Sequence, residues 1–254
     1  MKGNMSPLAK LLRVKYEPSK GNLFPIAAWV GIVIANYVGY HLIENWALQF
    51  LVTSIISVFL LGIALPIYWT VRKSKSLSEI GIMRKYLLLS LVLCFLIAAF
   101  EYYGTIVKMN IMLPAVDVLA PLVVVAIVAG FFEALFFRGW MQLRFEESFG
   151  IMPSIFLSAV FYSLYHIGYP GWIDVETLIT LFIVGIVFSA IFRITKNIFI
   201  IWPFTIPVGA VYDMLKHETY FPFEAIYGNL VIVFFIICLF VYVRRLKKAS
   251  APGV

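Results

Sequence analysis

The sequence predicts an all-α membrane protein with about eight transmembrane helices, and three observations lead to this fold class. Hydrophobic residues make up 63% of the 254 residues and charged residues only 13%, about half the charged fraction of an ordinary soluble domain. The mean hydropathy is +0.97. The apolar residues gather in runs of about 20, the length that a helix needs to cross a bilayer. Backbone polar groups in lipid must be satisfied within the chain, so we expect these runs to be helices.

Eight apolar runs are long enough to be membrane spans. They cover residues 23–43, 47–71, 86–107, 114–140, 153–170, 175–194, 197–215 and 224–243. We therefore expect one transmembrane bundle over residues 23–243, preceded by a cytoplasmic basic segment (1–22) and followed by a cytoplasmic tail (244–254). Because the first segment is basic and mixed, and the first apolar run lacks a small-residue cleavage site, we expect no cleavable signal peptide.

The basic residues predict the orientation of the bundle. With the N-terminus inside, 18 of the 20 Lys and Arg residues fall in cytoplasmic segments, and only Lys108 and Lys216 fall outside. Eight spans with both termini in the cytoplasm satisfy the positive-inside rule. The net charge of +7 is divided among short runs at the ends of spans, which argues against a nucleic-acid partner and for a lipid bilayer.

Two ionisable residues interrupt apolar spans. Glu133 lies in Leu119–Phe137, and His166 lies in Ile155–Ile167. A carboxylate at the centre of a membrane helix costs about 2.5–3.5 kcal/mol on insertion scales, so it usually has a function or a partner. Gly150 marks a turn 17 residues after Glu133 and 16 residues before His166. Antiparallel helices with equal rise would place the two side chains at one level, where they suit general-base chemistry or simply join two helices.

Three further residues are candidates to support this pair. Arg138 follows Glu133 by five residues, about 140° around an α-helix, so a direct pair within the helix is poor. Arg138 then either snorkels to the cytoplasmic interface or fixes a carboxylate or carbonyl in the bundle. Tyr162 lies one turn before His166, where it either hydrogen-bonds the imidazole or packs. Thr205 lies between two prolines, which free backbone carbonyls and predict a cavity wall.

These residues resemble motifs of the CPBP family of intramembrane proteases, the CAAX-prenyl endopeptidases and bacteriocin-immunity proteins, also called the Abi family. The first motif is Glu-Glu-x-x-x-Arg, often followed by Gly, and the chain has Glu133-Ala134-Leu135-Phe136-Phe137-Arg138-Gly139. The second is Phe-x-x-x-His, and the chain has Tyr162-Ser163-Leu164-Tyr165-His166. Residues 77–82 resemble the stretch ahead of the family's core, and residues 195–197 resemble the turn before its last motif. The similarity covers about residues 77–215.

The resemblance implies an intramembrane endopeptidase in which Glu133 is the general base and His166 orients the water or shuttles its proton. Arg138 would be structural. The chain departs from the family where Ala134 replaces the second Glu, and where Thr205 and Gly209 stand in place of a His and an Asn. Thr205 or freed backbone would then replace the oxyanion donor. Losing one such donor costs about 10²–10³ in rate in a serine protease, so a slow enzyme and an inactive, regulatory family member both stay open.

The remaining expectations concern partners and location. The resemblance implies a lipidated or membrane-inserted peptide as substrate, cut near its C-terminus, and we expect the protein in the plasma membrane. One Glu and one His are too few for a catalytic zinc, which normally has three protein ligands, so we expect no metal and no other cofactor. A proton-coupled carrier is a third hypothesis, weakened because no inverted repeat is visible.

Overall fold

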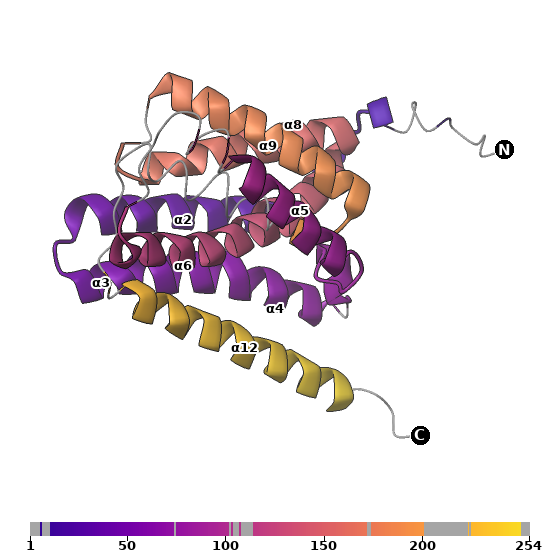
Figure 1. The fold of residues 1–254 in the computed structure, drawn as a ribbon. Helices are drawn as coiled ribbons and strands as arrows, with labels where there is room; N and C mark the ends of the chain where they lie inside the picture. Colours follow the sequence, from indigo (N-terminus) through magenta and orange to yellow (C-terminus); the bar gives the residue numbers. More distant parts are fainter. Residues whose placement is uncertain are drawn as a thin grey trace.

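The structure is a computed structural model of the chain. It describes residues 6, 11–73, 75–101, 103, 107, 114–171, 174–200, 223 and 225–249. Within these residues the chain forms helices and no strand (Figure 1). The predicted all-α fold class is therefore confirmed.

The described helices extend from residue 20 to residue 249. Their order is η1 (Lys20–Asn22), α2 (Leu23–Leu42), α3 (Trp46–Phe50), η2 (Leu51–Ala64), α4 (Leu65–Arg72), η3 (Leu77–Ile80), α5 (Leu87–Glu101), α6 (Val116–Glu133), η5 (Ala134–Gln142), α7 (Leu143–Phe149), α8 (Ile151–Tyr165), η6 (His166–Gly168), α9 (Val175–Thr195) and α12 (Ala225–Ala249). Of the η segments, η2 and η5 are π-helical, and η1, η3 and η6 are 3-10 helices.

Six helical rods in the described part of the chain are long and apolar enough to cross a membrane. They are Lys20–Leu42, Trp46–Arg72, Val116–Phe149, Ile151–Gly168, Val175–Thr195 and Ala225–Leu246. Each coincides with a predicted span, so the polytopic bundle is confirmed. The predicted span 86–107 begins with α5, and most of the span 197–215 lies outside the described residues. The total of eight spans stays a prediction.

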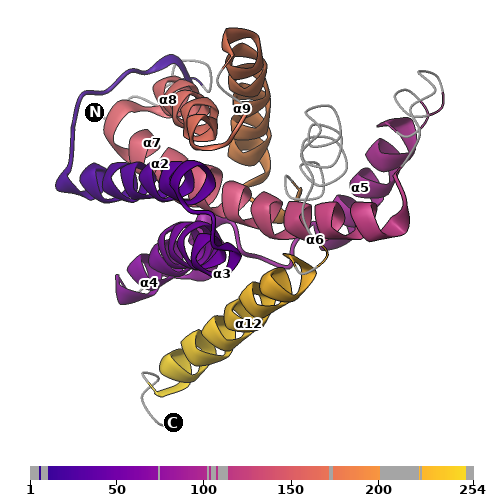
Figure 2. The same ribbon diagram turned by 90° about the vertical axis from the view of Figure 1, so that its left-hand side faces the viewer.

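One continuous rod organises the bundle. Helix α6 continues through η5 into α7, with α2 and η2 packed on one side and α8 and α9 on another (Figure 2). Helix α12 packs against α6 and η2 at the edge of the bundle. Every residue of η5 is buried, and its aromatic side chains form the middle of the hydrophobic core. The C-terminal end of α6, which holds Glu133, therefore lies at the centre of the molecule.

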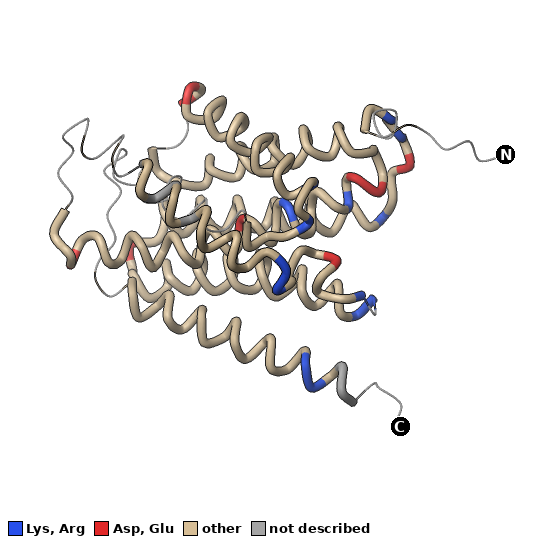
Figure 3. The backbone as a smooth tube through the Cα atoms, turned by 45° about the vertical axis from the view of Figure 1, so that its right-hand side comes forward, with Lys and Arg blue, Asp and Glu red and all other residues tan. Residues whose placement is uncertain are grey.

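The described Lys and Arg residues gather at one end of the bundle (Figure 3). The C-terminal end of α12, with Arg244 and Arg245, lies at this end (Figures 1 and 3). The same end holds the turn between α7 and α8, where the Lys15 amide donates to the carbonyl of Phe149 over 2.9 Å. By the positive-inside rule this is the cytoplasmic end. The orientation with both termini inside remains the prediction that this arrangement supports.

The predicted turn at Gly150 is present. Gly150 joins α7 to α8 with φ +96°, a conformation that glycine adopts without strain. A Cβ here would also collide with the backbone carbonyl of Arg13. The hairpin that sets the register of Glu133 against His166 therefore forms as the sequence predicts.

Candidate active site

Glu133 is the last residue of α6 and points toward the helix that follows the turn. Its carboxylate Oε1 accepts a hydrogen bond from the hydroxyl of Tyr165, and the Tyr162 hydroxyl lies within reach as well. The side chain is partly buried. Two tyrosine hydroxyls thus take the place that water would have around an exposed carboxylate, which is how a polar group is tolerated in an apolar span.

Arg138 lies in a π-helical segment, whereas the sequence analysis assumed α-helical spacing. Hydrogen bonds in a π-helix join residues five apart, so residue i+5 comes close to lying over residue i. The segment Ala134–Gln142 has this geometry. The charges of Arg138 and Glu133 attract one another, but the salt bridges of the described residues do not include a direct pair between them. The expectation that a direct pair within the helix is poor stays a prediction, although it assumed α-helical spacing where the structure has a π-helix.

The Arg138 guanidinium is enclosed by aromatic rings. Its Cζ lies 4.1 Å from the ring centroid of Tyr162, 5.6 Å from that of Phe188 and 5.8 Å from that of Phe137. Arg138 is 1% exposed, so the alternative in which it snorkels to the interface is excluded. Its Nε and Nη2 have no hydrogen-bond partner among the described residues. Three ring faces therefore surround this cation, and the charge of Glu133 attracts it without a direct ion pair.

His166 follows the last residue of α8 and is buried. Its Nδ1 lies 2.9 Å from the carbonyl oxygen of Tyr162. A carbonyl only accepts, so Nδ1 carries the proton, and in the neutral imidazole Nε2 is then the acceptor. The Tyr162 ring meets the imidazole edge-on with centroids 5.1 Å apart. Of the two roles predicted for Tyr162, its side chain packs on His166, and its backbone carbonyl provides the hydrogen bond.

Tyr165 connects the two predicted catalytic residues, although it is not one of the residues predicted to form the site. Its hydroxyl bonds to Glu133, and its ring centroid lies 4.1 Å from that of His166. The neglected signal was burial, because a tyrosine inside an apolar helix needs a partner for its hydroxyl. Glu133 was the polar residue expected at the same level. Tyr169 continues the cluster, since its hydroxyl lies beside those of Tyr165 and Tyr40.

Three hydrogen bonds between helices hold these elements in register. Trp29 donates to the Phe161 carbonyl over 2.8 Å and joins α2 to α8. Ser158 donates to the Phe137 carbonyl over 2.8 Å and joins α8 to η5. The Gln142 amide donates to the Ser189 carbonyl over 3.0 Å and joins η5 to α9. These bonds fix both sides of the hairpin that carries Glu133 and His166.

Three of the four stretches that resemble the family come together in space: the first motif, residues 77–82 and the turn at residues 195–197. A Cβ on Gly139 would collide with the Ile80 carbonyl, so η3 packs directly on η5. Gly81 has φ +83°, and its carbonyl accepts from the Ile198 amide over 3.1 Å. The Asn197 side chain donates to the Lys85 carbonyl. The segment 77–85 therefore links the first motif to the turn after α9.

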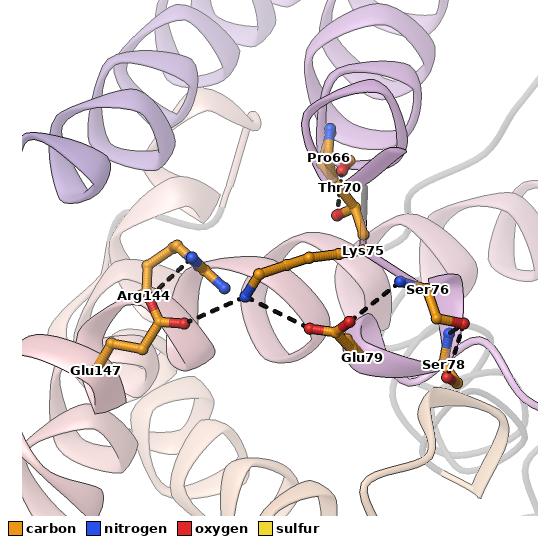
Figure 4. Close-up of polar contacts among 8 residues, drawn as sticks. All are labelled: Pro66, Thr70, Lys75, Ser76, Ser78, Glu79, Arg144 and Glu147. Atoms are coloured by element: carbon orange, nitrogen blue, oxygen red, sulfur yellow. Dashed lines mark hydrogen bonds and ion pairs between the residues drawn. The ribbon is translucent and has the colours of Figure 1, made fainter. Parts of the chain in front are cut away.

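An ionic bridge fastens the same loop to α7. The Lys75 ammonium lies 3.4 Å from Glu79 and 3.8 Å from Glu147, and Arg144 lies 2.8 Å from Glu147 (Figure 4). Glu79 also accepts from the Ser76 amide over 3.1 Å. That backbone hydrogen bond is the main reason why the pKa of Glu79 lies below its ordinary value.

Two predicted positions have no structural description. Thr205 and Gly209 both lie outside the described residues. Among the residues that are described, no group of three or more His, Cys, Asp or Glu side chains lies close enough to hold a metal ion. The cluster that can be described therefore consists of one carboxylate, one imidazole, one guanidinium and several tyrosine hydroxyls.

Comparison with known families agrees with the motifs. Residues 115–206 match the family described as type II CAAX prenyl endopeptidase Rce1-like. The matched segment begins at the start of α6 and includes Glu133, Arg138 and His166. It confirms the resemblance to the CPBP family that the sequence motifs indicated. No curated protein and no solved structure matches the chain.

Proposed function

We propose that this member of the CPBP family is an intramembrane endopeptidase, in which Glu133 and His166 activate water to hydrolyse a peptide bond. One observation carries the proposal: the Glu133 carboxylate, inside an apolar span, is bonded to a tyrosine whose ring lies against His166. Ionisable residues within membranes are costly and usually functional. Both residues lie in the segment that matches the CAAX prenyl endopeptidase family.

The geometry suits different roles for Glu133 and His166. Glu133 takes a proton from water as the water oxygen attacks the scissile carbonyl carbon, and that proton passes to the amine nitrogen when the C–N bond breaks. His166 is held through Nδ1, so its Nε2 accepts from the second hydrogen of the same water. Arg138 attracts the Glu133 carboxylate, and the Tyr165 hydroxyl ties that carboxylate to the second helix.

The supporting residues act on the water only through Glu133 and His166. The Tyr162 ring packs against the Arg138 guanidinium, and the Tyr162 backbone carbonyl accepts a hydrogen bond from the His166 imidazole. Thr205, outside the described residues, keeps its proposed role at the oxyanion. The six apolar rods make the chain an integral membrane protein. We propose the plasma membrane as its location and a lipidated peptide as its substrate, because the family match names prenyl endopeptidases.

The decisive experiment uses the purified chain in liposomes with a farnesylated, internally quenched peptide that ends in a CAAX sequence. Glu133→Gln removes the base and keeps the shape of the side chain. General-base catalysis contributes about 10²–10⁴-fold, so cleavage should fall by at least a hundredfold. Glu147→Gln is the matched control, because this half-exposed glutamate lies in the ionic bridge to α7. Equal cleavage by wild type and Glu133→Gln would refute the assignment.

A specific observation favours the alternative of a catalytically inactive member that binds or regulates a membrane partner. Ala134 stands where the family has its second carboxylate, and it is wholly buried in the hydrophobic core. Under this alternative no peptide is cleaved, and Glu133→Gln alters binding or stability alone. A cleavage product that disappears in His166→Ala would remove the alternative.

A further inference from the structure

Asn36 differs from every other buried asparagine in the described part of the chain. The others each donate from Nδ2 to an oxygen of another residue: Asn22 to Ser148, Asn197 to Lys85 and Asn229 to Ala225. Asn36 is 1% exposed, and neither its Oδ1 nor its Nδ2 has a hydrogen-bond partner among the described residues. A buried polar group left unpaired destabilises the folded state. Such a group calls for an explanation, and binding of a ligand is one.

Asn36 lies on the face of α2 that packs against the candidate active site. Gly168, two residues after His166, comes so near that a Cβ on it would lie 2.8 Å from the Cβ of Asn36. The Tyr169 hydroxyl lies beside the amide without forming a hydrogen bond of normal geometry. Tyr169 in turn lies beside Tyr165. The amide is therefore next to the end of α8 that carries the imidazole.

Hydrolysis by activated water needs a donor at this place. As the water oxygen adds to the carbonyl carbon, negative charge develops on the substrate oxygen, and a fixed N–H donor in a dry site is the usual means of stabilising it. Tyr165 already donates its proton to Glu133. Arg138 is stacked on Tyr162. The Nδ2 of Asn36 is a donor in this cluster that is not yet engaged.

We propose that the side-chain amide of Asn36 binds the carbonyl oxygen of the scissile peptide and stabilises the oxyanion that forms there. This inference rests on the proposed function and adds a group from helix α2, which lies outside the segment 115–206 that matches the family. The amide remains neutral, because it donates hydrogen bonds through its two N–H groups and does not lose a proton. The oxyanion site is then assembled across α2 and η6.

Stability and activity should separate in Asn36→Ala. An unpaired amide contributes nothing by hydrogen bonding, so removing it should leave the unfolding temperature unchanged or higher. Loss of one oxyanion donor should lower kcat by about 10²–10³-fold, with a much smaller change in KM. A purely structural amide would give the opposite pattern, with lower stability and little change in kcat. Asn36→Asp should lose more activity than Asn36→Ala, because a carboxylate repels the oxyanion.

The test combines the farnesylated CAAX peptide with a phosphinate analogue of the same peptide, which has an anionic tetrahedral centre at the scissile bond. Asn36→Ala should weaken binding of the phosphinate by the same factor as kcat/KM, while binding of the ordinary amide peptide stays within a few-fold. Asn229→Ala is the matched control, since it also removes a buried asparagine but from α12.

Each outcome decides between the two proposals. Cleavage with unchanged kcat in Asn36→Ala overturns the role of Asn36 and leaves the proposed function standing. Equal weakening of phosphinate and amide peptide, together with a lower unfolding temperature, also overturns it. Phosphinate binding that depends on Asn36 without any cleavage supports the amide as a ligand site while the endopeptidase proposal fails. If the wild type neither cleaves the peptide nor binds the phosphinate, both are overturned.

Discussion

The hydroxyl of Tyr165 donates to the carboxylate of Glu133 across the two helices of the central hairpin. This bond joins the residue before His166 to the end of α6. The Tyr165 ring also packs between Phe137, at 4.9 Å, and the imidazole, at 4.1 Å. The Tyr165 side chain therefore fixes the direction of the Glu133 carboxylate and packs against the His166 imidazole.

Tyr165→Phe should separate these two roles, because it keeps the ring and removes the hydroxyl. A hydrogen bond to a charged group contributes about 1.5–3 kcal/mol, so we expect the free energy of unfolding to fall by that amount. If Tyr165 positions the base, kcat should fall about ten- to a hundredfold while KM changes little. Unfolding in detergent and steady-state cleavage measure the two effects. Tyr227→Phe, on the exposed face of α12, should change neither, and an unchanged kcat in Tyr165→Phe would remove its positioning role.

Apolar run length was enough to predict the six spans that the structure describes, because the requirement to cross a bilayer leaves little freedom. The hairpin register followed from one glycine and nearly equal counts of residues on its two sides, 17 and 16. The helix type around Arg138 did not follow, because nothing in Ala134–Gln142 distinguishes a π-helix from an α-helix in composition. A change of helix type turns every later residue to a different face.

Asn36 was missed for a different reason. It lies in a long apolar run and belongs to none of the motifs. Only the packing of α2 against η6 brings it beside Gly168, two residues after His166. Contacts between elements about 130 positions apart in the chain carry no local pattern, so a site assembled from them is visible only in three dimensions.

Low pH should destabilise the segment 77–85, which links the first motif to the turn after α9. The backbone hydrogen bond from Ser76 lowers the pKa of Glu79 relative to its ordinary value of 4.5. The folded state therefore binds the proton less readily than the unfolded state. The stabilisation from Glu79 is fully present above pH 4.5 and is lost as the pH falls through the lower folded value.

Amide hydrogen exchange of residues 77–82 measured between neutral pH and pH 3, corrected for intrinsic exchange rates, should report this loss. Glu79→Gln should remove the acid-dependent part of the protection and leave a loop that is less protected at neutral pH. Glu176→Gln, an exposed glutamate in the first turn of α9, is the control and should keep the wild-type pH profile. Protection in Glu79→Gln that still falls with acid would assign the effect to another group.

The attraction between Glu133 and Arg138 predicts a specific pattern in a double-mutant cycle. The two groups attract one another without a direct ion pair, and removing one of two attracting buried charges leaves the other less compensated. Arg138→Met and Glu133→Gln should each destabilise the protein, Arg138→Met by the larger amount because it also empties the space over the Tyr162 ring. The double variant has no uncompensated charge, so its cost should be clearly less than the sum of the two single costs.

Unfolding by denaturant in mixed micelles measures all four members of the cycle. Arg72→Met, which removes an exposed arginine bonded to Tyr68 at the end of α4, should cost less than about 0.5 kcal/mol and add independently to Glu133→Gln. Independent sites add within about 0.3–0.5 kcal/mol. If Arg138→Met and Glu133→Gln also add within that margin, the π-helix does not couple them, and Arg138 is held by the aromatic rings alone.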